Sequence, residues 1–221
     1  MIFERLIPLY GEEGIQKLGK ARVAVIGLGG VGGIACEALA RSGVGHLLIC
    51  DFDRIEASNI NRQVIANQET LGKLKVEVMQ QKIKAINPDC EVIPYAVPYH
   101  NFLVSEHIDY VIDAIDDVAA KKMLISDCLS ANINFISSMG AGNKLNPELV
   151  KIMNIRETTH DPLARIIRTH FRENSFKVVA STEETKRTPN QTMIGSYMPV
   201  VATFGLLASH YITHEILRRP L

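Results

Sequence analysis

The chain has 221 residues, of which 47% are hydrophobic and 22% are charged. This composition predicts one compact α/β domain with a sizeable core. Lysine plus arginine and aspartate plus glutamate both total 24, so the formal net charge is zero. A balanced charge excludes a strong net positive field that would attract a polyanion, so any contact with nucleic acid must come from a local basic patch.

The cysteines and the chain ends indicate where the protein works. Four single cysteines lack the C-x-x-C spacing of a zinc site or redox dithiol, which favours buried thiols in a reducing compartment. The first residues contain acids and no uninterrupted apolar run, unlike a secretory signal. The apolar stretch 193–217 is broken by Gly195, Pro199 and Gly205, so we expect a buried helix and no membrane span. We therefore expect a cytoplasmic protein.

Apolar strand-like runs alternate along the chain with segments of helical periodicity. This alternation predicts an α/β fold with a Rossmann-like, doubly wound, mostly parallel sheet. Strands are expected at residues 23–26, 46–50, 92–95, 110–114 and 134–138. Helices are expected at residues 31–42, 73–86 and 118–130. A small C-terminal α/β extension adds strands at 152–155 and 177–180, a helix at 162–172 and a polar loop at 181–191.

We interpret residues 1–221 as a single domain. Its nucleotide-binding part covers residues 1 to about 140, and a substrate-facing extension covers about 141–221.

The glycine-rich turn at residues 27–32 is the first functional signal. Gly27 permits a tight turn after the strand, Gly29 lets the backbone approach a phosphate, and Gly32 lets the helix pack closely on the sheet. Gly30 belongs to the same turn. Asp51 closes the next strand, near the offset of an acid that binds ribose hydroxyls. These residues predict a nucleotide site.

Three side chains beyond the second strand separate an ATP-cleaving enzyme from a dehydrogenase. Asn59, Arg62 and Lys75 bring an amide and two cations to the loop and helix that follow. Attack at a phosphorus builds charge on phosphate oxygens, which arginine and lysine stabilise, whereas hydride transfer makes little use of them. Each cation taken alone is typical of solvated surface, so the argument rests on the three together.

The run Asp113–Asp117, DAIDD, ends the fourth strand and opens the next helix. Carboxylates at this edge can hold Mg²⁺ against phosphates. Asp116 or Asp117 can equally cap the helix without any metal. Both interpretations remain open at this point.

Together these motifs resemble the adenylating domain shared by ubiquitin-activating enzymes and the bacterial molybdopterin- and thiamine-pathway activators. The resemblance rests on GLGGVG, LLICDFD, NINRQ, GKLKVEV and DAIDD, in that order. It implies that the glycines, Asp51, Asp53 and Gln63 bind ATP, that Asn59, Arg62 and Lys75 contact the phosphates, and that Asp116 holds Mg²⁺. It leaves a monovalent cation open as a further ligand. Arg5 resembles the arginine that this family passes across a homodimer interface into the partner's ATP site.

The second half of the chain resembles one branch, the tRNA threonylcarbamoyladenosine dehydratases. The motifs are FISSMGAGNKLNP, DPLA and VVASTE. That branch uses ATP to activate the carboxylate of threonylcarbamoyladenosine in tRNA as an acyl-adenylate, and the carbamoyl group then closes a ring and expels AMP. Members often carry a cysteine before the Pro-Leu-Ala motif, where this chain reads Thr158 to Asp161. This departure argues against a sulfur-relay or carrier protein as partner.

Four cations are candidates for tRNA contact. Arg165, Arg168 and Arg172 recur at i, i+3 and i+7, along one face of a helix, which suits a nucleic-acid backbone but also a plain solvated face. Lys144 follows the glycines of SSMGAGN and is either a surface lysine or a contact to the substrate.

Three alternatives to an ATP-dependent tRNA dehydratase remain. An activator of a small ubiquitin-like sulfur-carrier protein fits the nucleotide motifs but lacks the paired zinc cysteines usual in those branches. A non-catalytic nucleotide-binding scaffold would not need Arg62, Lys75 and Asp116. An NAD dehydrogenase is the weakest alternative, because it leaves those same residues without a role.

Overall fold

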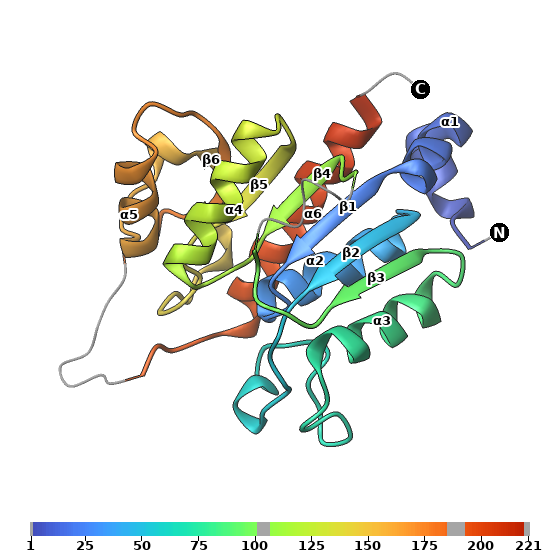
Figure 1. The fold of residues 1–221 in the computed structure, drawn as a ribbon, viewed down its shortest axis with the longest axis horizontal. Coiled ribbons are helices and arrows are strands. Elements are labelled where there is room, and N and C mark those ends of the chain that lie inside the picture. Colours follow the sequence, from blue (N-terminus) through green and yellow to red (C-terminus); the bar gives the residue numbers. More distant parts are fainter. Residues whose placement is uncertain (1, 101–106, 185–192, 219–221) are drawn as a thin grey trace.

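The computed structural model describes residues 2–100, 107–184 and 193–218. Its centre is a seven-stranded sheet in the order β3-β2-β1-β4-β5-β7-β6 (Figure 1). Neighbouring strands are parallel from β3 to β7, and β6 runs antiparallel to β7. The strands are β1 Arg22–Ile26, β2 His46–Cys50, β3 Glu91–Tyr95, β4 Tyr110–Asp113, β5 Asn134–Ser138, β6 Val150–Asn154 and β7 Lys177–Ser181. The predicted doubly wound, mostly parallel fold is confirmed.

Six α-helices surround the sheet in the described part of the chain: α1 Ile7–Lys20, α2 Gly30–Arg41, α3 Lys75–Ile86, α4 Val118–Ser130, α5 Pro162–His170 and α6 Met198–Arg218. Helix α1 was not predicted. The last helix begins at Met198 rather than near residue 193, with Pro199 in its first turn, where a missing N–H costs nothing. Most of the loop predicted at residues 181–191 lies outside the described residues.

The alternation of side chains along the strands builds two cores, one on each face of the sheet. Val23 and Val25 of β1 pack into a core shared with α2, α3 and α6. Ala24 and Ile26 point to the opposite face and join a core shared with α4 and α5. Figure 1 shows α2 and α6 behind the sheet and α4 in front of it. Among the residues that the structure describes, no helix combines the length and apolar character that a membrane span requires.

The strand order places a ligand crevice before any site residue is considered. From β1 the chain first winds toward β2 and β3, and it then returns to the other side of β1 to form β4 and β5. In an open parallel sheet the crevice at such a reversal, outside the carboxyl ends of the strands, is where ligands bind. The residues that follow β1, β2 and β4 therefore define the place to look for chemistry.

Candidate active site

A cleft of about 920 Å³ opens at the carboxyl ends of β1, β2 and β4. Its volume lies near the top of the range of about 300–1,000 Å³ typical of small-molecule sites, which leaves room for more than a small nucleotide. The cleft brings together most of the side chains singled out in the sequence. These are Gly27, Gly29, Gly30, Asp51, Asp53, Asn59, Arg62, Gln63, Lys75, Asp116 and Lys144.

The glycine turn needs its glycines for two separate reasons. Gly27 has φ +92°, and a Cβ there would lie 2.6 Å from the carbonyl oxygen of Ala114. A Cβ on Gly32 would lie 1.8 Å from the Gly27 carbonyl oxygen, so this glycine allows the turn to pack on its own helix and does not line the cleft. At Gly29 a Cβ would meet nothing nearer than Gln63, 4.0 Å away. The space beside Gly29 is thus free for a ligand at the N-terminus of α2.

Asp51 links the glycine turn to the end of β2. Its Oδ2 accepts a hydrogen bond from the Leu28 N–H at 2.6 Å, and its Oδ1 accepts one from the Asp53 N–H at 2.8 Å. Burial raises the pKa of the Asp51 carboxyl, while the nearby Lys75 ammonium and the two N–H groups oppose that shift. The carboxylate is therefore held in place at the rim of the cleft, where a ribose hydroxyl can reach its remaining lone pairs.

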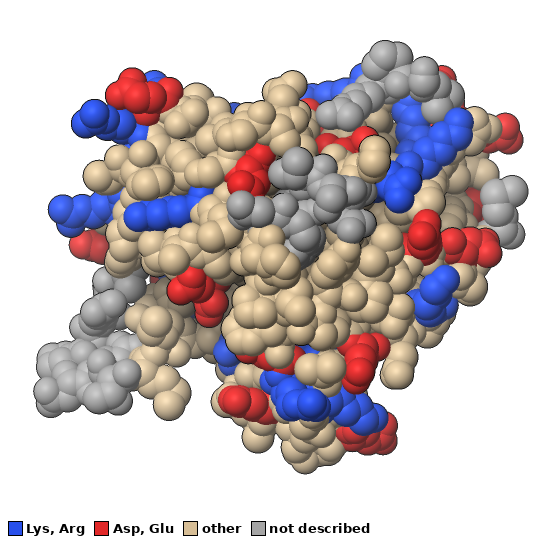
Figure 2. Space-filling model, viewed as in Figure 1, with Lys and Arg blue, Asp and Glu red and all other residues tan. Residues whose placement is uncertain are grey.

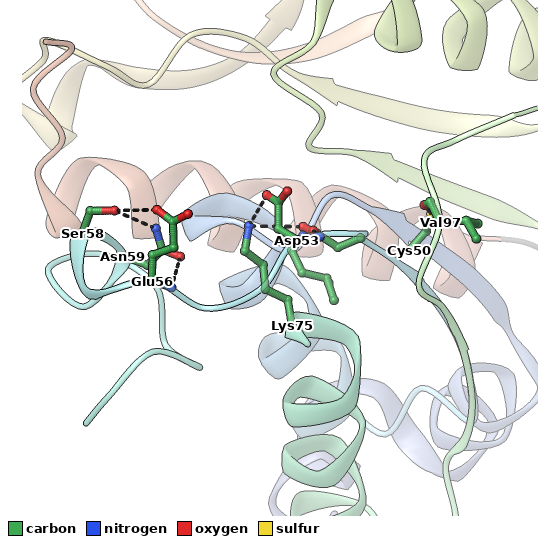
Figure 3. Close-up of polar contacts among 9 residues, drawn as sticks. Cys50, Asp53, Glu56, Ser58, Asn59, Lys75 and Val97 are labelled. Atoms are coloured by element: carbon green, nitrogen blue, oxygen red, sulfur yellow. Dashed lines mark hydrogen bonds and ion pairs between the residues drawn. The ribbon is translucent and has the colours of Figure 1, made fainter. Parts of the chain in front are cut away.

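Lys75 reaches from the first turn of α3 into the same region (Figure 3). Its Nζ lies 2.6 Å from Asp53 Oδ2 and 3.7 Å from Asp51 Oδ2. The Lys75 side chain is buried, whereas the Asp53 side chain is 50% exposed. Because Asp53 can be solvated without the lysine, the ammonium can turn from this carboxylate to a phosphate at little cost.

Asn59 and Arg62 lie on the other wall of the cleft. Glu56 and Asn59 form a capping box around the short helix Ala57–Asn59, and the Asn59 Nδ2 donates to Ser58 Oγ at 3.3 Å (Figure 3). The Arg62 Nη1 donates to the Ser58 carbonyl oxygen at 2.7 Å. Asn59 therefore shapes the loop that carries Arg62, and the arginine is the more available of the two for phosphate.

Gln63 supplies a buried polar atom without a partner. Among the described residues, its Oε1 is the one buried side-chain oxygen or nitrogen that makes no hydrogen bond. Its amide lies beside Gly29, at the phosphate end of the turn. Buried polar groups are normally hydrogen-bonded, so an unsatisfied amide here supports a ligand contact at this point of the cleft.

The two acids after β4 have different roles. Asp117 is the N-cap of α4, and its Oδ1 accepts from the Ala120 N–H at 2.8 Å. Asp116 makes no such contact and is exposed at the cleft. Among the described residues no group of three or more His, Cys, Asp or Glu could hold a metal. The single carboxylate of Asp116 is still compatible with Mg²⁺, because this ion is commonly bound by one or two carboxylates together with phosphates and water.

A buried charge cluster beneath the cleft was not predicted. Lys121 Nζ lies 2.7 Å from Asp113 Oδ2 and donates to the Ser138 carbonyl oxygen at 2.9 Å, and Ser137 also donates to Asp113. Both Lys121 and Asp113 are fully buried. The signal was present in the sequence, because Lys121 falls at the same helical spacing as Leu124 and Cys128, which form the buried face of α4.

A further wall of the cleft, predicted to face the substrate, is formed by residues 139–144 and the start of α5. Asp161 caps α5 through the Ala164 N–H at 3.0 Å, and its other oxygen accepts from the Gly140 N–H at 2.8 Å. Lys144 is buried rather than solvated, and its Nζ donates to the Glu183 carbonyl oxygen at 3.0 Å. Burial lowers the pKa of the Lys144 ammonium, and Asp161 and Glu183 oppose the shift.

Residues 193–197, here called the strap, lead into α6 along the edge of the cleft, and Ile194 and Ser196 line it. The Asn143 N–H donates to the Gly195 carbonyl oxygen at 2.8 Å, and the Gly195 N–H donates to Asn143 Oδ1 at 2.7 Å. Asn61 Nδ2 donates to the Ser196 carbonyl oxygen at 3.0 Å. The strap is thus anchored on both walls, and neither asparagine was predicted to take part.

A second, shallower cleft lies along α5 and is here called the basic groove. It shares Asp161, Pro162 and Ile166 with the main cleft, so the two are contiguous. Its other lining residues are mainly basic: Lys122, His160, Arg165, Arg168, Thr169, His170, Arg172 and Glu184. Lysine and arginine side chains stand out near α5 in Figure 2, on a face that otherwise mixes both signs.

The three predicted arginines differ in their surroundings. Arg168 Nη1 donates to the carbonyl oxygen and Oγ1 of Thr158, both at 2.6 Å, which ties the helix to the preceding loop. Arg165 and Arg172 are exposed. Arg172 lies two residues beyond the end of α5, yet it still lines the groove with the other two.

Arg5 does not reach the cleft of its own chain. It lies before α1, which leads into the amino end of β1, whereas the cleft opens at the carboxyl ends of the strands. The neighbouring Phe3 packs beside Gly43, just before the amino end of β2. Figure 1 shows α1 beyond that end of the sheet.

The fold and the glycine turn at the carboxyl edge of the sheet define a nucleotide-binding α/β protein. The chain belongs to the ThiF family, whose sequence profile matches residues 3–220. It is 44% identical over 171 residues to the tRNA threonylcarbamoyladenosine dehydratase of Bacillus subtilis, a match that covers 76% of this chain and 67% of that protein. It is 36% identical to the Haemophilus influenzae protein of the same name, over 96% of this chain and 91% of the other.

The solved structures agree with the sequence comparison. The chain superposes with a TM-score of 0.91 on the E. coli tRNA N6-threonylcarbamoyladenosine dehydratase in complex with ATP. The two are 33% identical, and the match covers 97% of this chain and 93% of that one. The predicted family and branch are thereby confirmed.

Proposed function

We propose that this protein is an ATP-dependent dehydratase that acts on threonylcarbamoyladenosine in tRNA. The observation that carries the proposal is the cleft itself, in which a glycine turn, Arg62, Lys75 and Asp116 surround space for phosphates and a contiguous basic groove leads away along α5. Relatives that carry this name, and one of them solved with ATP, support the assignment. The four cysteines are all free buried thiols, which fits a cytoplasmic location.

The reaction has two steps, and each step releases its own leaving group. A carboxylate oxygen of the modified base attacks the α-phosphorus of ATP, and pyrophosphate leaves. The carbamoyl group of the same base then attacks the activated carboxyl carbon, AMP leaves with the former carboxylate oxygen, and a proton is lost as the ring closes. The net change in the tRNA is the loss of one water. The nucleophile belongs to the substrate, so the protein supplies position and charge stabilisation.

The chain's own residues have separable roles in this scheme. Asp51 binds the ribose, and the N-terminus of α2 with Gly29 cradles phosphate. Arg62 offers a planar fork and Lys75 a point charge to the oxygens on which charge develops. Asp116 would hold Mg²⁺, which would neutralise the phosphates. Lys144 lies on the substrate wall, where its ammonium attracts the substrate carboxylate.

The basic groove is the proposed path of the tRNA backbone. Because the groove is contiguous with the main cleft, a modified tRNA nucleotide bound beside ATP would have its flanking nucleotides beside α5. Arg165 is exposed, and Arg172 is exposed with its Nε 3.3 Å from the exposed Glu173 carboxylate, a weak surface pair that a phosphate can replace, whereas Arg168 is largely occupied by Thr158. We place the tRNA contacts on the two exposed arginines first.

The proposed assembly is a homodimer in which Arg5 completes the partner's site. Arg5 is exposed and lies at the opposite end of the sheet from its own cleft, so any catalytic contact must be made in another chain. Mixing Arg5→Ala with Arg62→Ala protein tests this directly. Restored turnover in the mixture supports the shared site, and a mixture as inactive as its parents contradicts it.

The alternative is adenylation of the C-terminus of a small ubiquitin-like sulfur-carrier protein. The nucleotide half of the cleft suits it equally well, since both reactions activate a carboxylate. The basic groove favours the tRNA substrate, because a carrier protein has no polyphosphate backbone to place there.

The deciding experiment incubates the protein with ATP, Mg²⁺ and tRNA that carries threonylcarbamoyladenosine, and then weighs the modified nucleoside. A loss of about 18 Da that requires ATP is expected, the mass of the water removed when the activated carboxyl is captured intramolecularly. Asp116→Ala should abolish the change, while Asp89→Ala, an exposed acid outside the cleft, should not. An unchanged mass with the wild type overturns the tRNA assignment and favours the carrier protein.

A further inference from the structure

The Arg62 guanidinium is held from one side only. Its Nη1 donates to the Ser58 carbonyl oxygen at 2.7 Å and to Asn61 Oδ1 at 3.1 Å, which uses both hydrogens of that nitrogen. In the described part of the chain, Nε and Nη2 donate to no protein acceptor. These two N–H groups form the fork that matches a pair of phosphate oxygens. Ser58 and Asn61 therefore orient the arginine and leave its binding edge to the ligand.

Asn61 does not act on Arg62 alone. While its Oδ1 accepts from the arginine, its Nδ2 donates to the carbonyl oxygen of Ser196 in the strap, at 3.0 Å. One carboxamide thus joins a phosphate-binding cation to a segment that lies 135 positions away in the chain. Because a planar amide cannot rotate to serve one partner without disturbing the other, the two contacts are geometrically coupled.

The strap is anchored at its other end on the substrate wall. Asn143 exchanges two hydrogen bonds with Gly195, at 2.7 and 2.8 Å, and Asn143 directly precedes the buried Lys144. Asn143 has φ +57°, a left-handed conformation that fixes the direction of its side chain. The strap therefore connects the wall that holds Arg62 with the wall that holds Lys144.

We infer that Asn61 is a positioning residue for Arg62 and that it does this work only when the strap is seated between Asn61 and Asn143. This inference rests on the proposed function for its catalytic readout. The phosphate edge of Arg62 is then correctly aimed when both walls of the cleft are connected. A substrate that presses on the strap would reach the ATP phosphates through a single side chain.

The chain offers variants that separate the parts of this arrangement. Asn61→Leu removes both carboxamide contacts without adding charge, and Asn61→Gln keeps both groups on a longer stem. Asn143→Gly removes the side-chain half of the anchor, the bond from the Gly195 N–H, and keeps the bond that its own backbone N–H donates to the Gly195 carbonyl oxygen. It also keeps the left-handed backbone, which glycine adopts freely. Asn132→Gly is the matched control, since Asn132 also has a positive φ, of 52°, but is exposed in the turn before β5.

The catalytic measurement is the rate of AMP formation with modified tRNA. Loss of one aiming hydrogen bond should lower kcat about tenfold in Asn61→Leu, while KM for ATP changes by less than about twofold. Asn61→Gln should recover much of the rate. Asn143→Gly should lower kcat about threefold, and the double variant should be about tenfold slower rather than thirtyfold, because both changes disable one coupled unit.

Amide hydrogen exchange gives a readout that needs no tRNA. The peptide that covers the strap should exchange faster in Asn61→Leu and in Asn143→Gly, and at the wild-type rate in Asn132→Gly. Asn61 is exposed, so Asn61→Leu is expected to fold, and Asn61→Ser repeats the test with less apolar surface. An unchanged kcat in both Asn61→Leu and Asn61→Ser, or fully multiplicative effects of Asn61→Leu and Asn143→Gly, overturns the inference. If the wild type converts no tRNA, the proposed function fails, and the exchange rates alone decide whether Asn61 holds the strap.

Discussion

Two lysine–aspartate ion pairs flank β1 at the carboxyl edge of the sheet, and they are built from the same chemistry in different surroundings. Lys121 and Asp113, beside β4, are both fully buried and share further bonds with β5. Lys75 and Asp53, beside β2, form a similarly short contact, but the Asp53 side chain is half exposed. A buried pair cannot be broken without stranding a charge, whereas a half-exposed carboxylate can release its lysine to another anion. Burial of the partner acid, more than the length of the ion pair, therefore distinguishes a lysine that stabilises the fold from a lysine that can bind a ligand.

The largest expected effect is on stability at the buried pair. Lys121→Met leaves Asp113 as an unpaired buried charge and should lower the free energy of unfolding by about 3–5 kcal/mol. Lys75→Met leaves Asp53 in contact with solvent and leaves Asp51 with two N–H donors, so it should cost less, about 1–2 kcal/mol, most of it from the lost charge beside the buried Asp51. Urea unfolding of the two variants measures this difference. Equal losses would show that exposure of the acid does not distinguish the pairs.

The next effect is on catalysis, where a change at the Lys75 region should matter more than a change at the buried pair. Removing a charge that stabilises the developing phosphate should lower the rate of AMP formation about 10²–10³-fold in Lys75→Met or Arg62→Ala. Arg62→Lys should not restore it, because a point charge lacks the fork. Lys73→Met, at an exposed lysine two positions from Lys75, is the control and should keep full activity. Wild-type rates in folded Lys75→Met protein would remove that lysine from the mechanism.

A smaller effect is expected in the basic groove, where the same distinction applies to arginines. Arg165→Ala and Arg172→Ala should each weaken tRNA binding about fivefold and lower the slope of log affinity against log salt by about one. Arg168→Ala should instead lower stability, because its guanidinium holds Thr158. Filter binding at several salt concentrations and thermal melting separate the two outcomes. Arg41→Ala, at an exposed arginine paired with Glu37, is the matched control.

The smallest expected effect is a pH dependence at Lys144. Burial lowers the pKa of its ammonium, so as pH rises the charge is lost before that of an ordinary lysine. If this charge attracts the substrate, KM for tRNA should rise with pH, and the rise should begin at a pH below the pKa of an ordinary lysine. Lys144→Arg keeps its charge throughout and should remove the alkaline rise. A wild-type KM that stays flat into the alkaline range would assign Lys144 to packing alone.

The elements of the fold were predictable because the patterns that specify them are local. Strand periodicity predicted all seven strands of the sheet, and the glycine turn and Asp51, which were predicted to lie together, line the same cleft. Helix α1 was missed because its apolar positions are interrupted by glycines, and Gly11 indeed adopts a non-helical φ of +68° within it. Bounds were least accurate at the last helix, where the apolar run extends back beyond its first turn.

The contacts that complete the site were not predictable in this way, since they join segments far apart in the chain. The bond from Asn61 to Ser196 and those from Asn143 to Gly195 depend on how the strap crosses the cleft. Both asparagines lie within motifs, NINRQ and SSMGAGN, but neither motif shows what the asparagine side chain contacts. Lys144 is likewise buried and bonded to the carbonyl oxygen of Glu183, 39 positions later, so its sequence neighbours could not show whether it is solvated.

The packing of α6 behind the glycine turn has a consequence for how the protein is made. A Cβ on Gly30 would lie 2.3 Å from Val201, and one on Gly205 would lie 2.4 Å from the Val31 carbonyl oxygen, so the two helices meet almost backbone to backbone. Contacts between such distant segments form late, after loop closure across most of the chain. During synthesis, the phosphate cradle emerges from the ribosome well before the helix that supports it. ATP binding should therefore be acquired only after α6 has been synthesised.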